Sequence, residues 1–191
     1  MIYTTLNKIR EHSPCVSSWE KLLESIGKTK ADGDPLAMVH ILNALNVQDF
    51  FWATRALPEF KKVWVGLACD MAEHVLPIFE VKHPCDKRPR KCIEVIRSWL
   101  IGGATIEEVR DAAYAAYAAR AAADVAYATR AAAYAVRAAA CVIRAAAGDA
   151  YAAADAAACA TDAVDDAYAE RKWQAARIRE VLEATPEKGG E

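Results

Sequence analysis

The chain has 191 residues and a formal net charge of −2 at pH 7, a length that can bury a hydrophobic core without disulfides or structural metals. Hydrophobic residues make up 54% of the chain but aromatic residues only 8%, because alanine dominates residues 112–169. Alanine is the strongest helix former, and with only eight Gly and seven Pro the composition excludes an all-β or collagen-like fold. The near-neutral charge gives no global attraction to nucleic acid or anionic lipid.

The first 103 residues have the pattern of amphipathic helices separated by turn residues. Pro and Gly mark the breaks, as at His83-Pro84 and Gly102-Gly103, and Pro77 is expected to kink or end its helix. Apolar residues recur at i, i+3 and i+4 in five segments: 16–26, 35–45, 47–56, 60–79 and 88–101. The expected core members are Phe50, Phe51, Trp52, Trp64, Leu67, Leu76, Ile78, Phe79, Ile93, Ile96 and Trp99.

A capping box opens the alanine-rich half of the chain. Thr105 supplies the cap hydroxyl and Glu108 follows three residues later. From residue 110 to residue 144 the larger side chains recur about every 3.4 residues, against 3.6 for a straight helix. This segment therefore either supercoils around its neighbours or consists of two shorter helices. We expect a break at Gly148, one further helix from about Asp149 to Ala184, and a frayed tail.

These patterns predict an all-α fold, a multi-helix bundle with an alanine-rich, tightly packed helical C-terminal half. Faces made of alanine let helix axes approach closely. We expect a mixed amphipathic half over residues 1–103, an alanine-rich half over 104–185 that shares one core with it, and a disordered tail over 186–191.

Arginine and tyrosine form a stripe along the alanine tract. Residues 110–144 contain five Arg, whereas residues 145–170 contain only acidic charged residues, so two arms folded back about Gly148 would bring opposite charges together. One interpretation is a set of ion pairs that fix the register of the two arms. The other is a pocket in which Arg binds phosphate and Tyr stacks on bases. This Arg/Tyr stripe comprises Tyr114, Tyr117, Arg120, Tyr127, Arg130, Tyr134, Arg137 and Arg144.

A second candidate surface is the basic run near residue 90. Its basic patch consists of Lys87, Arg88, Arg90 and Lys91, and is either an ordinary solvated surface or a docking site for an acidic partner or a phosphate backbone. Because no aromatic residues are interleaved with these charges, we do not expect single-stranded nucleic acid to bind here.

The sequence predicts no metal site, no cofactor and no enzymatic activity. Cys69 and His74 lie five residues apart, which does not match a zinc-ligand pattern, and we expect a packed thiol and a surface imidazole. No nucleophile elbow, phosphate-binding loop or metalloprotease motif occurs in the sequence. The six cysteines are scattered, so we expect reduced thiols. Without a leader-like start, and with Arg and Asp interrupting the alanine tract, we expect a cytoplasmic protein that does not enter membranes.

Three segments resemble a known family. They are residues 69–80 (CDMAEHVLPIFE), residues 86–94 (DKRPRKCIE) and residues 102–108 (GGATIEE), followed by an alanine tract with periodic Tyr and Arg. Together they resemble the immunity proteins of bacterial polymorphic-toxin loci, a family also found in phage and prophage genomes. The resemblance extends over most of the chain, from about residue 49 onward, although relatives often carry Trp in the tract where this sequence has Tyr.

The resemblance implies an all-helical, non-enzymatic protein that binds and neutralises a toxin, or a host defence component where a phage carries the gene. Arg88, Arg90 and Lys91 fall in its most distinctive segment. The second hypothesis is a sponge that sequesters a nucleotide-type immune signal at the Arg/Tyr stripe. A third treats the alanine surface as an oligomerisation face, and the sequence leaves homo-oligomerisation open.

Overall fold

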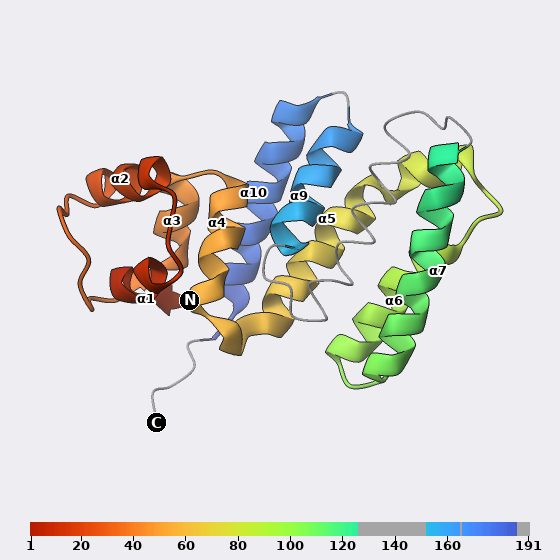
Figure 1. The fold of residues 1–191 in the computed structure, drawn as a ribbon, viewed down its shortest axis with the longest axis horizontal. Coiled ribbons are helices and arrows are strands. Elements are labelled where there is room, and N and C mark those ends of the chain that lie inside the picture. The colour runs from red at the N-terminus through yellow and green to blue at the C-terminus, as the bar shows by residue number, and fades with distance from the viewer. Residues whose placement is uncertain (126–151, 165, 187–191) are drawn as a thin grey trace.

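A computed structural model describes residues 1–125, 152–164 and 166–186, and most of these residues are helical (Figure 1). The predicted all-α class is therefore confirmed. The strands of the described part are two residues long: β1 (Tyr3–Thr4) pairs antiparallel with β2 (Leu36–Ala37).

Four short helices build the N-terminal part: α1 (Leu6–Glu11), α2 (Val16–Ser25), α3 (Met38–Ala44) and α4 (Val47–Ala53). The short α1 was not predicted; Thr5 caps it by accepting a hydrogen bond from the Lys8 amide at 3.2 Å. The helix predicted over 35–45 begins only at Met38, because Leu36 and Ala37 pair with β1. The helix predicted over 47–56 ends in a 3-10 turn, η1 (Thr54–Ala56), and a second such turn, η2 (Pro58–Phe60), leads into α5.

The long helix α5 (Lys61–Lys82) crosses the middle of the molecule, between the N-terminal helices and the pair formed by α6 (Arg88–Leu100) and α7 (Ile106–Val125) (Figure 1). It continues through Pro77 for another turn. The predicted break at Gly102-Gly103 is confirmed. Gly102 has φ +83°, a backbone conformation that favours glycine, and a Cβ on Gly103 would lie 2.7 Å from the Ser98 hydroxyl, which would have to move.

The predicted capping box begins α7. The Glu108 amide donates to the Thr105 hydroxyl at 3.2 Å, and the Glu108 carboxylate accepts from the Thr105 amide at 2.7 Å. The same hydrogen bond lowers the pKa of Glu108. Residues 126–151 lie outside the described part of the chain. The predictions that the tract beyond α7 supercoils or breaks, and that its arms fold back at Gly148, concern these residues.

The single helix predicted from Asp149 to Ala184 is wrong. The structure has two helices, α9 (Ala152–Ala163) and α10 (Ala167–Ala184). Asp166 begins α10: its carboxylate accepts hydrogen bonds from the amides of Tyr168 at 3.1 Å and Ala169 at 2.9 Å. A capping carboxylate satisfies amides that have no partner at a helix start. Sequence reasoning counted Asp166 among the acidic charges of the arm and overlooked it as a cap.

One cluster of buried side chains runs from Ile2 to Leu182. Of the predicted core residues, Trp52, Ile78 and Trp99 are only partly buried against this cluster, and the others are buried. Helix α9 packs against α4, α5 and α10. The face it uses consists of small residues that are at most 2% exposed: Ala152, Ala156, Ala157, Ala160 and Ala163. The division at residue 103 and the tail over 186–191 stay predictions.

Replacing Asp166 should change the free energy of unfolding in opposite directions for two separate helices and for one continuous helix. If α10 begins at Asp166, Asp166→Ala lowers the free energy of unfolding by about 1 kcal/mol. In a continuous helix the same substitution would stabilise the protein, because alanine is the better helix former. Urea unfolding followed by circular dichroism measures the difference. Asp166→Asn, which retains a capping oxygen, is the control and should stay close to the wild type.

Candidate functional site

The basic patch lies at the start of α6, where two of its arginines are held by carboxylates. Arg88 binds both oxygens of Asp86, at 2.9 Å through Nε and 2.6 Å through Nη2. Arg90 binds both oxygens of Glu80 on α5, at 2.6 and 2.7 Å. These hydrogen bonds lower the pKa of Asp86 and of Glu80. Arg90 therefore ties α6 to α5, and its charge is neutralised within the protein.

The two lysines of the patch keep their charge available. Lys91 lies 3.8 Å from Glu94, and both side chains are well exposed, so this pair contributes little stability. Lys87 forms no ion pair with the described residues. The positive potential of the basic patch thus comes mainly from Lys87 and Lys91, with the paired Arg88 beside them.

A groove brings this patch against the start of the alanine tract. The α7 side of the groove carries Ala112 and Ala115, whose short side chains leave the surface low. Helix α7 also exposes Tyr114, at 69% of its surface. The α6–α7 groove is lined by Cys85, Asp86, Lys87, Arg88, Lys91, Cys92, Ala112 and Ala115. The structure therefore places three of the four patch residues on one surface with the beginning of the tract.

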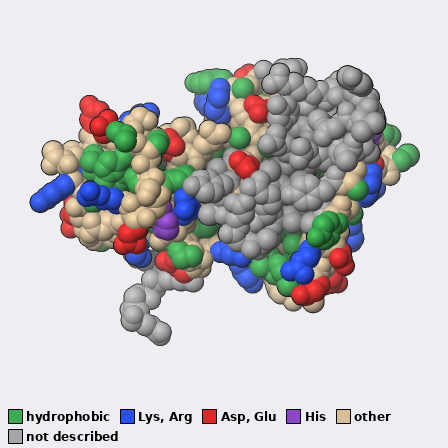
Figure 2. Space-filling view, in the orientation of Figure 1, with side chains coloured by type: hydrophobic (Ala, Val, Ile, Leu, Met, Phe, Trp, Pro, Cys, Tyr) green, Lys and Arg blue, Asp and Glu red, His purple; other side chains and the backbone are tan. Residues whose placement is uncertain are grey.

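Both basic and acidic side chains lie around the turn between α6 and α7, at the lower right of the molecule (Figure 2). The turn between these helices also exposes Ile101 almost completely, at 87%. An apolar residue beside charges is common on protein surfaces, so this tip alone identifies no site.

Most of the Arg/Tyr stripe lies outside the part of the chain that the structure describes. Tyr114 is the member whose side chain the structure describes. Tyr117 and Arg120 belong to α7, but their side chains are outside the description. The remaining members lie outside the described residues altogether: Tyr127, Arg130, Tyr134, Arg137 and Arg144. A pocket along the stripe stays a prediction.

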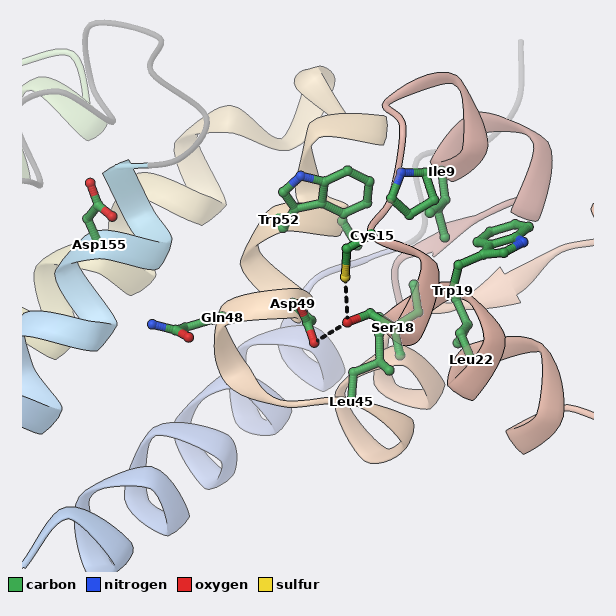
Figure 3. Close-up of a pocket in the computed structure, with 13 residues that line it drawn as sticks. Ile9, Cys15, Ser18, Trp19, Leu22, Leu45, Gln48, Asp49, Trp52 and Asp155 are labelled. Atoms are coloured by element: carbon green, nitrogen blue, oxygen red, sulfur yellow. Dashed lines mark hydrogen bonds between the residues drawn. The ribbon is translucent and has the colours of Figure 1, made fainter.

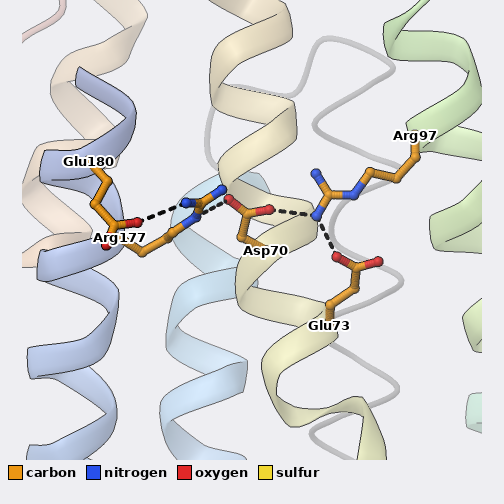
Figure 4. A network of polar contacts seen from close by, with 5 residues as sticks. All are labelled: Asp70, Glu73, Arg97, Arg177 and Glu180. Atoms are coloured by element: carbon orange, nitrogen blue, oxygen red, sulfur yellow. Dashed lines mark hydrogen bonds and ion pairs between the residues drawn. The ribbon is translucent and has the colours of Figure 1, made fainter. Parts of the chain in front are cut away.

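A polar network joins α6 and α10 to the central helix α5 (Figure 4). The carboxylate of Asp70 accepts from Arg97 of α6 at 2.5 Å and from Arg177 of α10 at 2.8 Å. Arg97 also binds Glu73, and Arg177 binds Glu180 at 2.8 Å. Burial opposes the charged form of Arg97, but the hydrogen bonds to Glu73 and Asp70 raise its pKa overall. The network fixes the position of the helix that carries the basic patch.

A second buried polar group links α5 to α10. The His74 Nδ1 atom lies 2.8 Å from a Glu170 oxygen, and the His74 ring stacks on Trp173 at 3.7 Å. Gln174 donates to the other oxygen of Glu170 at 2.9 Å. Glu170 is only 3% exposed, and both its oxygens are satisfied. The prediction of a surface imidazole is confirmed, because His74 is exposed, and its ring also contacts the buried carboxylate of Glu170.

The thiol predicted to pack in the core does so. Cys69 is fully buried, and burial raises its pKa to about 12. Cys15, Cys69, Cys85, Cys92 and Cys159 are all free thiols. Among the described residues, no three His, Cys, Asp or Glu side chains are arranged to hold a metal ion.

A pocket of about 340 Å³, which no pattern in the sequence predicts, lies between the N-terminal helices (Figure 3). A chain of hydrogen bonds lies along it: the Cys15 thiol donates to Ser18 at 3.0 Å, and Ser18 donates to Asp49 at 2.9 Å. The pocket is lined by Ile9, Pro14, Cys15, Ser18, Trp19, Leu22, Ile41, Leu45, Gln48, Asp49, Trp52, Ala53 and Asp155.

Comparison with known proteins identifies a family for the central and C-terminal parts of the chain. Residues 59–181 match a family model described as "Imm-5 like putative immunity protein". The match includes α5, α6 and α7, hence the whole α6–α7 groove, and ends within α10. No curated protein and no solved structure matches the chain. In the described part of the chain, no helix is both long and apolar enough to span a membrane.

The network around Asp70 gives a stability prediction. Asp70 is 11% exposed at its side chain and serves two arginines, so Asp70→Asn should lower the free energy of unfolding by about 2 kcal/mol, the scale of hydrogen bonds to charged groups. Glu180→Gln removes the other carboxylate that binds Arg177, but Glu180 is 66% exposed, and its loss should cost less than about 0.5 kcal/mol. Urea unfolding with an unchanged slope measures both; equal losses would contradict a special role for Asp70.

Proposed function

We propose that this chain, which belongs to the Imm-5 like immunity protein family, neutralises a protein toxin by binding it stoichiometrically and without catalysis. The family match supports a toxin-neutralising role in general. The finer steps are ours: that a protein is the target, that binding alone inactivates it, and that a host defence effector takes the place of the toxin where a phage carries the gene. The cytoplasm is the compartment in which we expect this to occur.

The observation that carries the binding mode is the α6–α7 groove. All its lining residues belong to the segment that matches the family, and Lys87 and Lys91 give it a positive edge. Charge complementarity across an interface speeds association and selects partners. An acidic segment of the target is therefore the chemistry that fits this groove.

Arg88 suits the same role because it is already oriented. Its bidentate contact with Asp86 uses Nε and one hydrogen of Nη2. A guanidinium has five N–H donors, so three remain that have no partner among the described residues. A partner carboxylate could accept from them without displacing Asp86, and little side-chain freedom would be lost on binding.

Charge reversal in the groove tests this proposal. The experiment expresses candidate polymorphic toxins in bacteria and measures growth with and without the chain; the complex with the neutralised toxin is then measured by calorimetry. Lys87→Glu combined with Lys91→Glu should abolish protection and weaken binding at least about tenfold, the effect of about 1.4 kcal/mol. The matched control is Lys8→Glu with Lys21→Glu, which reverses two exposed charges on α1 and α2. Full protection by the groove variant would contradict the proposed surface.

The sponge remains a second proposal, with the exposed Tyr114 as its described member. It requires that the Arg/Tyr stripe bind a nucleotide-type signal. Native mass spectrometry of protein purified from cells would then show a few hundred daltons of extra mass, on the order of one nucleotide, that denaturation releases. Arg130→Ala and Arg137→Ala should abolish that extra mass and leave the melting temperature unchanged. A lowered melting temperature would instead identify these arginines as parts of an internal ion-pair seam.

A further inference from the structure

We propose that the pocket between the N-terminal helices is a binding site for a small organic cation, an ammonium group on an apolar or aromatic body. All its lining residues except Asp155 lie outside the segment that matches the immunity family. The inference does not depend on toxin binding at the α6–α7 groove.

The pocket has the size and walls of a small-molecule site. Its volume, about 340 Å³, falls within the range of pockets that enclose small ligands, and such pockets combine apolar walls with a few placed polar groups. Three helices, α1, α2 and α3, each contribute a buried apolar side chain to the walls: Ile9, Leu22 and Ile41. A ligand with an apolar body would gain free energy by leaving water here.

Two indole rings favour a ligand that carries a positive charge over a neutral apolar ligand. Trp19 of α2 and Trp52 of α4 both line the pocket, and both are only partly buried, although they pack against the core. The faces of indole rings attract cations more strongly than those of other aromatic side chains. Trp52 already shows this behaviour, because the Arg55 guanidinium lies 5.7 Å from its ring centre.

The charge of the lining has one sign. Among the lining residues that the structure describes there is no Lys, Arg or His, and Asp49 places a carboxylate beside Ser18. An anion is therefore disfavoured. A carboxylate beside apolar walls and indole faces is instead the combination that recognises an ammonium group.

Asp49 is held in a defined orientation by its neighbours. Its Oδ2 atom accepts from Ser18 and from the Asn46 amide group, both at 2.9 Å. Cys15 in turn donates to Ser18, so the thiol positions the hydroxyl. Figure 3 shows the carboxylate of Asp49 directed toward Ser18 within the pocket.

Helix capping does not require the Asp49 carboxylate. The side chain of Asn46 caps α4 by accepting from the Asp49 amide at 2.8 Å. A carboxylate has about four acceptor positions, and the contacts with Ser18 and Asn46 both fall on Oδ2. Asp49 therefore has acceptor capacity left for an ammonium donor.

Three probes of similar shape and different charge test the proposal: 2-phenylethylammonium, neutral 2-phenylethanol and anionic 3-phenylpropionate. Binding to the full chain is measured by tryptophan fluorescence and by amide chemical-shift changes. We expect the ammonium to bind about tenfold more tightly than the alcohol, the scale of one charge-assisted hydrogen bond, and the carboxylate to bind most weakly. Affected amides should belong to residues 9–22 and 41–53.

Asp49→Asn should remove the preference for the ammonium and leave binding of the alcohol unchanged, whereas Glu24→Gln, which removes an exposed charge from α2, should preserve the preference. Three equal affinities, no binding of the ammonium at about 10 mM, or a preference that survives Asp49→Asn would overturn the proposal. If Asp49→Asn fails to fold, the ranking of the three probes by the wild-type protein decides the question.

Discussion

The arrangement of the helices around α5 depends on one carboxylate that serves two arginines. Asp70 is mostly buried and accepts from Arg97 and Arg177, which come from helices on different sides of α5. A carboxylate and a guanidinium taken from water must find good partners, because an unpaired charge in the interior is costly. The three side chains therefore fix α6 and α10 relative to α5 more specifically than apolar contacts would, and the position of the α6–α7 groove follows from this.

Alanine sets the other constraint. Helix α9 lies against α4, α5 and α10, and only small side chains fit on the faces that it presents to them. This packing positions α4, whose Asp49 and Trp52 line the N-terminal pocket together with Trp19 of α2. The alanines of α9 carry no functional group, but their packing positions α4. Helix α4 in turn forms one wall of the N-terminal pocket.

Local patterns in the sequence predicted most of the helices, but they did not predict contacts between residues that are far apart in the chain. Apolar periodicity and the Gly102-Gly103 and Thr105 signals located α6, the turn and α7, because caps and turns depend on residues close together in the chain. The error at Asp166 arose because a capping Asp and a solvated Asp look alike until the neighbouring amides are known. The partners Asp70 and Arg177 are 107 residues apart, and Asp49 meets Ser18 across 31 residues, so no spacing in the sequence announces either contact.

The charge of the basic patch also depends on long-range contacts that the sequence does not reveal. The basic patch has four positively charged residues, but Arg90 of α6 is paired with Glu80 of α5, and Arg88 is paired with Asp86. What distinguishes the groove is therefore the pair of lysines and an oriented guanidinium beside an alanine surface, rather than the number of cations.

Hydrogen–deuterium exchange of the chain, alone and in complex with a toxin that it neutralises, tests the central claim most directly. If binding at the α6–α7 groove neutralises the toxin, exchange slows in residues 85–92 and 109–116 and is unchanged in α1 and α2. Protection confined to other parts of the chain would contradict the account.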